Sequence, residues 1–160
     1  MQKFVGLIQE YLQDVKEIMP WDLEERMQAN PDLLIVDVRE QSEFDAMHLD
    51  GSLNVPRGIL ESACEWDFEE TEPRLVKARK QEVVVVCRSG HRSVLAAFSL
   101  KTLGYENVVS LKTGLRGCND YEMPMVDRNG NPVDFDDGDV YFATRLRKDQ
   151  MKPEDWVEPE

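Results

Sequence analysis

The sequence predicts an α/β domain built on a mainly parallel sheet. Two continuous apolar runs, at 33–38 and 83–86, lack the polar alternation of a half-exposed strand and are typical of strands buried on both faces of a parallel sheet. Segments with helical periodicity stand between and around them, and strands that alternate with helices form parallel sheets. The length of 160 residues, 41% of them hydrophobic, suits one domain with a core of ordinary size.

The N-terminal part of the chain predicts two helices before the first strand. Apolar residues recur at helical spacing over 3–19, which indicates an amphipathic helix. Pro20 suits the first turn of a second helix, which is expected to run to Ala29 and to stop at Asn30-Pro31. The first buried strand then follows over 33–38.

The elements between the two buried strands are short. Ser42 is a candidate N-cap for a helix near 43–46, and a short strand over 53–56 ends at a proline. The stretch 57–82 is rich in acidic residues and gives a weaker signal. Apolar residues at 75–78 predict a helix there, just before the second buried strand.

The alternation continues after the second buried strand. A helix is expected from about Ser93 to Leu103, and Gly104 is its candidate C-cap. A strand over 108–111 and a short helix that begins at Gly114 complete the pattern.

We therefore divide the chain into an N-terminal amphipathic helix (1–19), a central domain (20–125) and an acidic C-terminal extension (126–160). The extension is interpreted as a solvated connection, in which Trp156 either docks onto the body or stays loose. Its aspartates do not form a calcium-binding loop, because the position that requires glycine holds Pro132 or Asp139.

Charge and composition narrow the classes of partner. The formal net charge of -13 argues against nucleic acid or an anionic membrane as the main partner, since both require a basic surface. No stretch approaches the ~20 apolar residues of a membrane span. The first 19 residues lack the features of a signal peptide, so a cytoplasmic location is the expectation.

The three cysteines, Cys64, Cys87 and Cys118, are too few and too scattered to predict a disulfide framework. None belongs to a group with zinc-ligand spacing, so we expect no metal site. An odd number of cysteines fits a reducing compartment, or one working thiol beside two that pack.

The stretch Cys87-Arg88-Ser89-Gly90-His91-Arg92-Ser93 carries the strongest functional signal. It joins the carboxyl end of the second buried strand to a helix, at the sheet edge where ligands bind in open α/β folds. In such a turn, successive backbone N–H groups can form an anion-binding concavity, which the helix N-terminus reinforces. Glycine permits the required backbone, and the arginines and serines add charge and hydroxyl donors.

A cysteine at the centre of that turn is expected to be a nucleophile. Nearby cations and a helix N-terminus lower a thiol pKa from ~8.5 to about 3.5–7.5, which favours the reactive thiolate. The same donors would bind an oxyanion substrate such as a phosphate ester, an arsenate or a sulfur oxyanion. The plainer alternative is a small buried hydrophobe that ends a valine strand, but the polar residues that follow favour the functional interpretation.

These residues resemble the active-site loop of rhodanese-like sulfurtransferases, whose pattern is Cys-Arg-x-Gly-x-Arg/Thr-Ser. The upstream block LLIVDVREQSEFDAMHLDGSLNVP is similar to a second motif of that family, and GYENV and LKTG are similar to a third. The resemblance covers roughly residues 20 to 125 and consists of three ordered blocks.

The resemblance implies a central five-stranded parallel sheet with helices on both faces, and a reaction without metal or organic cofactor. It implies that Cys87 takes a sulfane sulfur from a sulfur oxyanion such as thiosulfate and passes it to cyanide or a thiol, a protein thiol included. The donor would be bound by residues 88 to 93: Arg88, Ser89, Gly90, His91, Arg92 and Ser93.

Four further residues match the upstream motif and are expected to support the site without taking part in the chemistry: Asp37, Arg39, Glu43 and His48. The first three are expected to form an ion-pair framework at the strand end. His48 is expected to have a structural role. His91 either tunes donor choice or simply faces water, and Cys64 and Cys118 are expected to be packing thiols.

Other functions stay open at the level of the sequence. A low-turnover sulfur carrier would use the same cysteine and would dock a partner, for example through the acidic region 61–72 that contains Trp66 and Phe68. A phosphatase or arsenate reductase of the same fold is disfavoured because Cys87 to Arg92 spans six residues, one fewer than the phosphatase loop.

Overall fold

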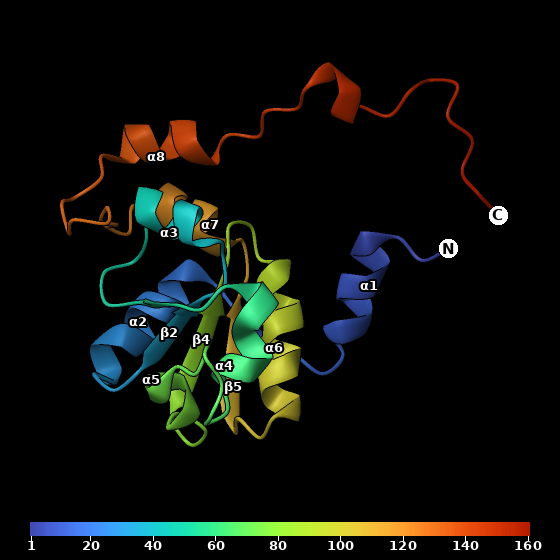
Figure 1. Ribbon diagram of the computed structural model, residues 1–160. Coiled ribbons are helices and arrows are strands. Elements are labelled where there is room, and N and C mark those ends of the chain that lie inside the picture. Colours follow the sequence, from blue (N-terminus) through green and yellow to red (C-terminus); the bar gives the residue numbers. More distant parts are fainter.

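The computed structural model describes residues 1–160 and contains one five-stranded sheet, in the order β1-β5-β4-β2-β3, with every neighbouring pair parallel (Figure 1). The predicted α/β class with a parallel five-stranded sheet is confirmed. The strands are β1 (Glu17–Ile18), β2 (Leu34–Asp37), β3 (Leu53–Asn54), β4 (Glu82–Val86) and β5 (Asn107–Leu111).

The central strand β4 is buried on both faces, as its unbroken apolar sequence predicts. Side chains of successive strand residues point to opposite faces of a sheet. Val83 and Val85 accordingly belong to one hydrophobic cluster, and Val84 and Val86 belong to the other. The sheet therefore separates two cores, and helices cover both.

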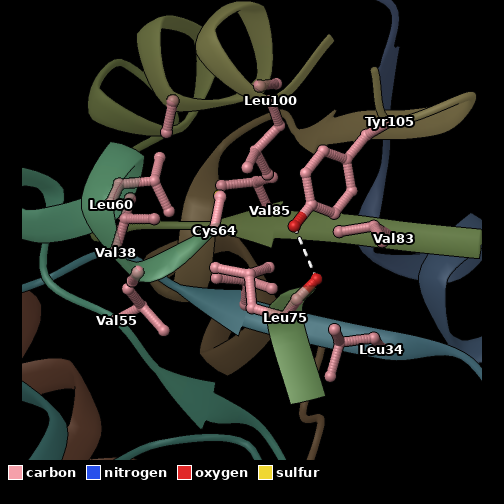
Figure 2. Close-up of a cluster of buried hydrophobic side chains, with 14 of the residues drawn as sticks. Leu34, Val38, Val55, Leu60, Cys64, Leu75, Val83, Val85, Leu100 and Tyr105 are labelled. Carbon is pink, nitrogen blue, oxygen red and sulfur yellow. Dashed lines mark hydrogen bonds between the residues drawn. The ribbon is translucent and has the colours of Figure 1, made fainter. Parts of the chain in front are cut away.

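One face is covered by α1 (Phe4–Tyr11), α4 (Leu60–Ala63), α5 (Pro73–Val76) and α6 (Arg92–Thr102). Figure 2 shows this core, where Cys64 lies among aliphatic side chains and the Tyr105 hydroxyl donates a hydrogen bond to the carbonyl of Leu75. The other face is covered by α2 (Pro20–Ala29), α7 (Gly114–Asp120) and α8 (Phe135–Phe142). Helix α3 (Gln41–Ala46) and the 3-10 turns η1 (Arg57–Ile59) and η2 (Lys148–Gln150) bury no side chain.

The predicted N-terminal helix over 3–19 is wrong in its extent. Helix α1 ends at Tyr11, and Glu17 and Ile18 form an edge strand that pairs with Ser110 and Leu111 of β5. The apolar residues of this segment fit a helical period. The residues at its end, however, form backbone pairs with the neighbouring strand β5. Tertiary pairing here overrides local periodicity.

The predicted N-cap of α3 is also wrong. The cap is Glu40 in place of Ser42, and the Glu40 amide donates to the Glu43 carboxylate at 3.0 Å. A carboxylate three residues into a helix can close its first turn in this way. The helix therefore begins earlier than the sequence predicted, and Glu43 lies in its first turn.

The C-terminal extension contains an element that the sequence analysis interpreted as solvated connection. Asp134 caps α8 by accepting a hydrogen bond from the amide of Asp136 at 2.8 Å, and Asp136 and Asp137 lie in the first turn of the helix. Acidic residues are favourable at this end of a helix. At the other end Phe142, only 1% exposed, packs into the core that α7 covers. Trp156 is 54% exposed and does not dock.

No helix of the chain has both the length and the apolar character required to cross a bilayer.

Candidate active site

The loop 87–91 connects the carboxyl end of β4 to α6, at the edge of the sheet above which α8 lies in Figure 1. Cys87 directly follows the last strand residue and is 1% exposed. Its sulfur therefore lies at the base of the loop, below the surface of the chain.

Two backbone amides donate to the Cys87 sulfur, and the thiol itself donates to a hydroxyl oxygen. The backbone N–H of Gly90 donates to Sγ at 3.1 Å, and the N–H of Ser93 donates at 3.3 Å. The Ser93 hydroxyl also lies 3.3 Å from Sγ, and it accepts a hydrogen bond of 2.7 Å from the hydroxyl of Ser110 on β5. When the sulfur is ionised, the Ser93 hydroxyl can turn to donate to it. The predicted concavity of backbone amides is present and faces inward.

Other amides of the loop are available to a ligand. The backbone N–H groups of Ser89, His91 and Arg92 make no hydrogen bond within the chain. Ser89 and His91 are exposed and Arg92 is half-buried, so these three amides can be reached from outside the chain. Together with the two amides on the sulfur they give the loop more donors than the thiol uses, which suits an anion or a second sulfur atom.

The first turn of α7 holds the loop from behind. The amides of Leu115 and Arg116 donate to the carbonyls of Cys87 and Arg88 at 2.9 and 3.1 Å. These two bonds fix the start of the loop, and the amides of Gly90 and Ser93 further along it donate to the sulfur. Gly114 makes this approach possible, because a Cβ there would lie 2.5 Å from the backbone of Arg88.

Gly114→Ala is expected to slow reaction at the Cys87 thiol by roughly ten- to a hundredfold, since a displaced reacting group can cost about that much. The new Cβ must push the Arg88 backbone away and open the cradle. Thiocyanate formation from thiosulfate and cyanide, the reaction that the resemblance of the loop implies, would measure the loss per folded protein. Gly51→Ala is the control: Gly51 has φ +80° but nothing within 4 Å of its Cβ position. If the two changes lowered activity equally, the loss would come from backbone strain at a positive φ and not from contact with the loop.

Arg92 and Glu43 form a two-pronged ion pair, with both Nη–Oε distances 2.9 Å, between the start of α6 and the first turn of α3. Burial acts to raise the pKa of Glu43, but hydrogen bonds from Arg92 and from the Glu40 amide outweigh it and hold this pKa below its ordinary value. The same pairing raises the pKa of Arg92. The pair fixes α3 against the loop, and it takes up the Arg92 charge.

The Glu43 carboxylate should make stability depend on pH in acid. Its pKa is lower in the folded chain, so its contribution is complete above the ordinary value of 4.5 and is lost as pH falls through the lowered folded value. We expect Glu43→Gln to have a lower free energy of unfolding than wild type near neutrality. The difference should shrink as pH falls below 4.5. Urea unfolding across acidic pH measures this. Glu69→Gln, at an exposed residue, should show no such trend; parallel curves for wild type and Glu43→Gln would contradict the assignment.

The Arg88 side chain makes its hydrogen bonds to α8 and none to the Cys87 sulfur. Its guanidinium donates from Nη2 to the carbonyl of Phe142 at 2.8 Å and to that of Ala143 at 3.3 Å, at the C-terminal end of α8. Carbonyls at this end of a helix lack intrahelical partners, and a cation there is favourable. The structure therefore assigns to Arg88 a contact with the C-terminal extension that the sequence did not predict.

Asp37 and Arg39 form an ion pair in which both side chains are fully buried, with an Nη2–Oδ2 distance of 2.8 Å. Arg39 also donates to the carbonyl of Met47 at 2.7 Å, and the Asn54 amide donates to the carbonyls of Asp37 and Arg39 at 3.0 Å. These bonds tie the end of β2 to β3 and to the segment after α3. They agree with a framework role for Asp37 and Arg39. Glu43 was predicted to join this framework, but its carboxylate is paired with Arg92.

The two histidines lie apart from the sulfur. The His48 ring stacks on Phe44 at 3.7 Å, its Nδ1 is 2.7 Å from the carbonyl of Phe44, and its backbone bridges to Val126. His91 is exposed and packs edge-on against Phe4 of α1, with ring centroids 5.5 Å apart. Ser89 is exposed and borders a surface pocket of about 620 Å³ that Trp21 and Tyr121 also line.

Cys64 and Cys118 are packing thiols in opposite cores and are both fully buried. Burial raises the pKa of Cys64, and burial raises the pKa of Cys118 to about 12. Neither forms a disulfide. No group of three or more potential ligands among His, Cys, Asp and Glu side chains is placed to hold a metal ion.

Sequence reasoning missed two contributors to this region. Ser110 supports the Ser93 hydroxyl, and the available signal was a serine inside the apolar strand Val108-Val109-Ser110-Leu111. Tyr141 of α8 lies within the electrostatic influence of Arg39, Glu43 and Arg88, and burial raises its pKa. A helix capped by an aspartate could be predicted from the sequence of the extension. Its position over the edge of the sheet could not be predicted.

The model of the rhodanese-like domain matches residues 20–120. The chain belongs to the rhodanese-like domain family. The match leaves α1 and α8 outside it.

Two relatives carry names from sulfur metabolism. The chain is 34% identical over 91 residues to "Putative thiosulfate sulfurtransferase, mitochondrial" of Schizosaccharomyces pombe, covering 55% of this chain and 64% of that protein. It is 28% identical over 102 residues to "Putative sulfur carrier protein YrkF" of Bacillus subtilis, covering 64% of this chain and 50% of that protein. The chain thus matches between half and two thirds of each relative's length.

Among solved structures, a Rhodopseudomonas palustris protein described as "Possible Tyrosine Phosphatase" superposes with a TM-score of 0.69 at 23% identity, over 78% of this chain and 95% of that chain. At this identity the likeness concerns the fold alone. The comparisons together support a sulfurtransferase or sulfur carrier of the rhodanese family.

Proposed function

We propose that the protein is a sulfurtransferase in which Cys87 carries the transferred sulfur as a persulfide. The observation that supports this best is the convergence of the Gly90 and Ser93 amides on Sγ, at 3.1 and 3.3 Å, within the stretch from Cys87 to Ser93. Amides in this arrangement stabilise negative charge on sulfur before and after transfer. The donor and acceptor are a small sulfane compound and a thiophile such as cyanide or a thiol.

In the first step the Cys87 thiolate attacks the outer sulfur of a donor such as thiosulfate. The new bond joins Sγ to that sulfur, the sulfur–sulfur bond of the donor breaks, and sulfite leaves with the electron pair. In the second step cyanide or a thiolate attacks the outer sulfur of the persulfide. The Sγ–S bond then breaks, its electrons return to Cys87, and the thiolate is regenerated.

The residues of the loop have distinct parts in this scheme. The Gly90 and Ser93 amides bind the sulfur of Cys87, and the amides of Ser89, His91 and Arg92 are available for the outer sulfur or the donor oxyanion. The Arg92 charge acts from within its pair with Glu43. The amides that do not contact Sγ are thus available to stabilise the outer sulfur, which carries the negative charge of the persulfide.

The direct test is the intact mass of the protein after treatment with a sulfane donor. One sulfur atom should add about 32 Da, and peptide mapping should place it on Cys87. Cyanide should remove it and yield one equivalent of thiocyanate. An adduct on Cys64 or Cys118, or no adduct with any donor, would overturn the proposal. Hydrolysis of p-nitrophenyl phosphate in place of sulfur transfer would favour a phosphatase.

A sulfur carrier is the second candidate, and the burial of Cys87, 1% exposed, favours it. A buried persulfide would be released slowly to small acceptors and would need a protein acceptor that opens the loop. The exposed Trp66 and Phe68, predicted as a docking surface for such a partner, lie elsewhere: Glu65 pairs with Arg79 and Lys77 lies over Trp66, before the start of β4 and so at the end of the sheet opposite Cys87. Stable sulfur loading with little steady-state thiocyanate formation would distinguish a carrier from an enzyme that turns over.

A further inference from the structure

The C-terminal helix α8 holds the residue next to the nucleophile. Two carbonyls at its end, those of Phe142 and Ala143, accept hydrogen bonds from the Arg88 guanidinium. Figure 1 shows α8 above α3 and α7, beyond the edge of the sheet from which the catalytic loop emerges. Arg88 is thereby turned toward the extension, so its charge is not directed at the cradle around Sγ.

Helix α8 is fixed to α7 by close contacts. The Asn119 side chain, 3% exposed, donates to the Asp139 carboxylate at 2.7 Å and to the carbonyl of Phe135 at 3.3 Å. Gly138 lies directly on Asn119, since a Cβ there would be 2.2 Å from its side-chain oxygen. Phe142 fills the core below. The helix is thus docked at both ends and keeps the carbonyls that accept from Arg88 in place.

Two other arginines of the site already have carboxylate partners, since Arg92 is paired with Glu43 and Arg39 is paired with Asp37. Lys112 and Arg116 form no ion pair, but they border surface pockets that the exposed Ser89 also lines. Among the arginines of the loop, Arg88 is therefore the one without a carboxylate partner that could balance a doubly charged donor, and α8 holds it. The formal net charge of -13 also opposes the approach of a dianion.

We propose that α8 withholds Arg88 from the cradle and thereby makes Cys87 selective for sulfane donors with less negative charge than the thiosulfate dianion. Thiosulfonates, which are monoanions, and persulfides that carry little charge are the donor classes that fit. The proposal rests on the sulfurtransferase function proposed above. It adds to that function a substrate class and a specificity element, α8, that lies outside the part of the chain matched by the family model.

The proposal is tested with two sulfur donors that form the same persulfide but differ by one negative charge. Methanethiosulfonate differs from thiosulfate in having a methyl group in place of one charged oxygen. In both reactions the Cys87 thiolate attacks the outer sulfur and forms the same persulfide. Methanesulfinate leaves with the electron pair in one case and sulfite leaves in the other. The ratio of the two kcat/KM values, with cyanide as acceptor, does not depend on the fraction of protein that is folded.

The wild-type protein is expected to use methanethiosulfonate with a kcat/KM about tenfold or more above that for thiosulfate, the size of one charge-assisted hydrogen bond. Asn119→Ala removes the two bonds that fix α8, and Gly138→Val forces the helices apart. Both changes should raise kcat/KM for thiosulfate about tenfold by freeing Arg88, and should leave methanethiosulfonate nearly unchanged. Gly58→Val is the matched control, because nothing lies within 4 Å of the Cβ position of Gly58.

Arg88→Met decides whether the gain comes through Arg88. In the Asn119→Ala background it should abolish the gain for thiosulfate, whereas in the wild-type background it should leave the donor ratio nearly unchanged. A wild-type protein that prefers thiosulfate would overturn the inference. So would α8 variants with an unaltered ratio, or a gain that survives Arg88→Met. If no donor loads sulfur onto Cys87, the proposed function itself fails, and the two failures are distinct.

Discussion

Replacement of Cys87 by serine is expected to lower thiocyanate formation by about 10⁴-fold or more, the usual effect of removing a catalytic nucleophile. A hydroxyl stays protonated at neutral pH and cannot form a persulfide. The substitution is nearly isosteric, and serine can still accept from the Gly90 and Ser93 amides, so the fold should persist. Steady-state assays with thiosulfate and with a thiosulfonate, normalised to folded protein, measure the loss.

The matched controls are Cys64→Ala and Cys118→Ala. Both thiols lie in apolar cores away from the loop's hydrogen bonds, so these variants should lose stability but keep activity per folded molecule. A Cys87→Ser protein that retains turnover, or a Cys118→Ala protein that loses it, would move the chemistry to another thiol.

The second large effect is expected from Asp37→Asn. The change leaves the Arg39 guanidinium, fully buried, without a counter-charge, and breaking a buried ion pair costs about 3–5 kcal/mol of unfolding free energy. Urea unfolding monitored by circular dichroism gives the difference.

Glu61→Gln provides the comparison for that experiment. Its pair with Arg57 is solvated, with side chains 50% and 34% exposed, and such pairs contribute at most about 1 kcal/mol. Activity per folded molecule should stay near wild type in both variants, because neither residue contacts Cys87. Equal stability losses, or an activity loss in Asp37→Asn that exceeds its unfolding, would contradict the framework role of Asp37.

Tertiary contacts account for the predictions that were wrong. Residues 17–18 have a helical apolar period, yet β5 offers an unpaired edge that takes them as a strand. The substrate-binding role predicted for Arg88 and Arg92 stays a prediction, but the partners of their side chains could not be predicted. Their side chains diverge to Phe142 and Glu43, which lie 54 and 49 residues away along the chain. Such partners are invisible to a local pattern.

The sequence by itself determined the fold class and identified Cys87 as the candidate nucleophile. A strand that is apolar without alternation must be covered on both faces of the sheet. A turn that follows it and contains a glycine and two arginines predicts that backbone amides surround the Cys87 side chain. Only the tertiary structure decided which charges reach that cysteine. Hydrogen bonds between segments far apart in the chain direct each guanidinium, and the packing of α8 on α7, which local periodicity does not encode, set the partner of Arg88.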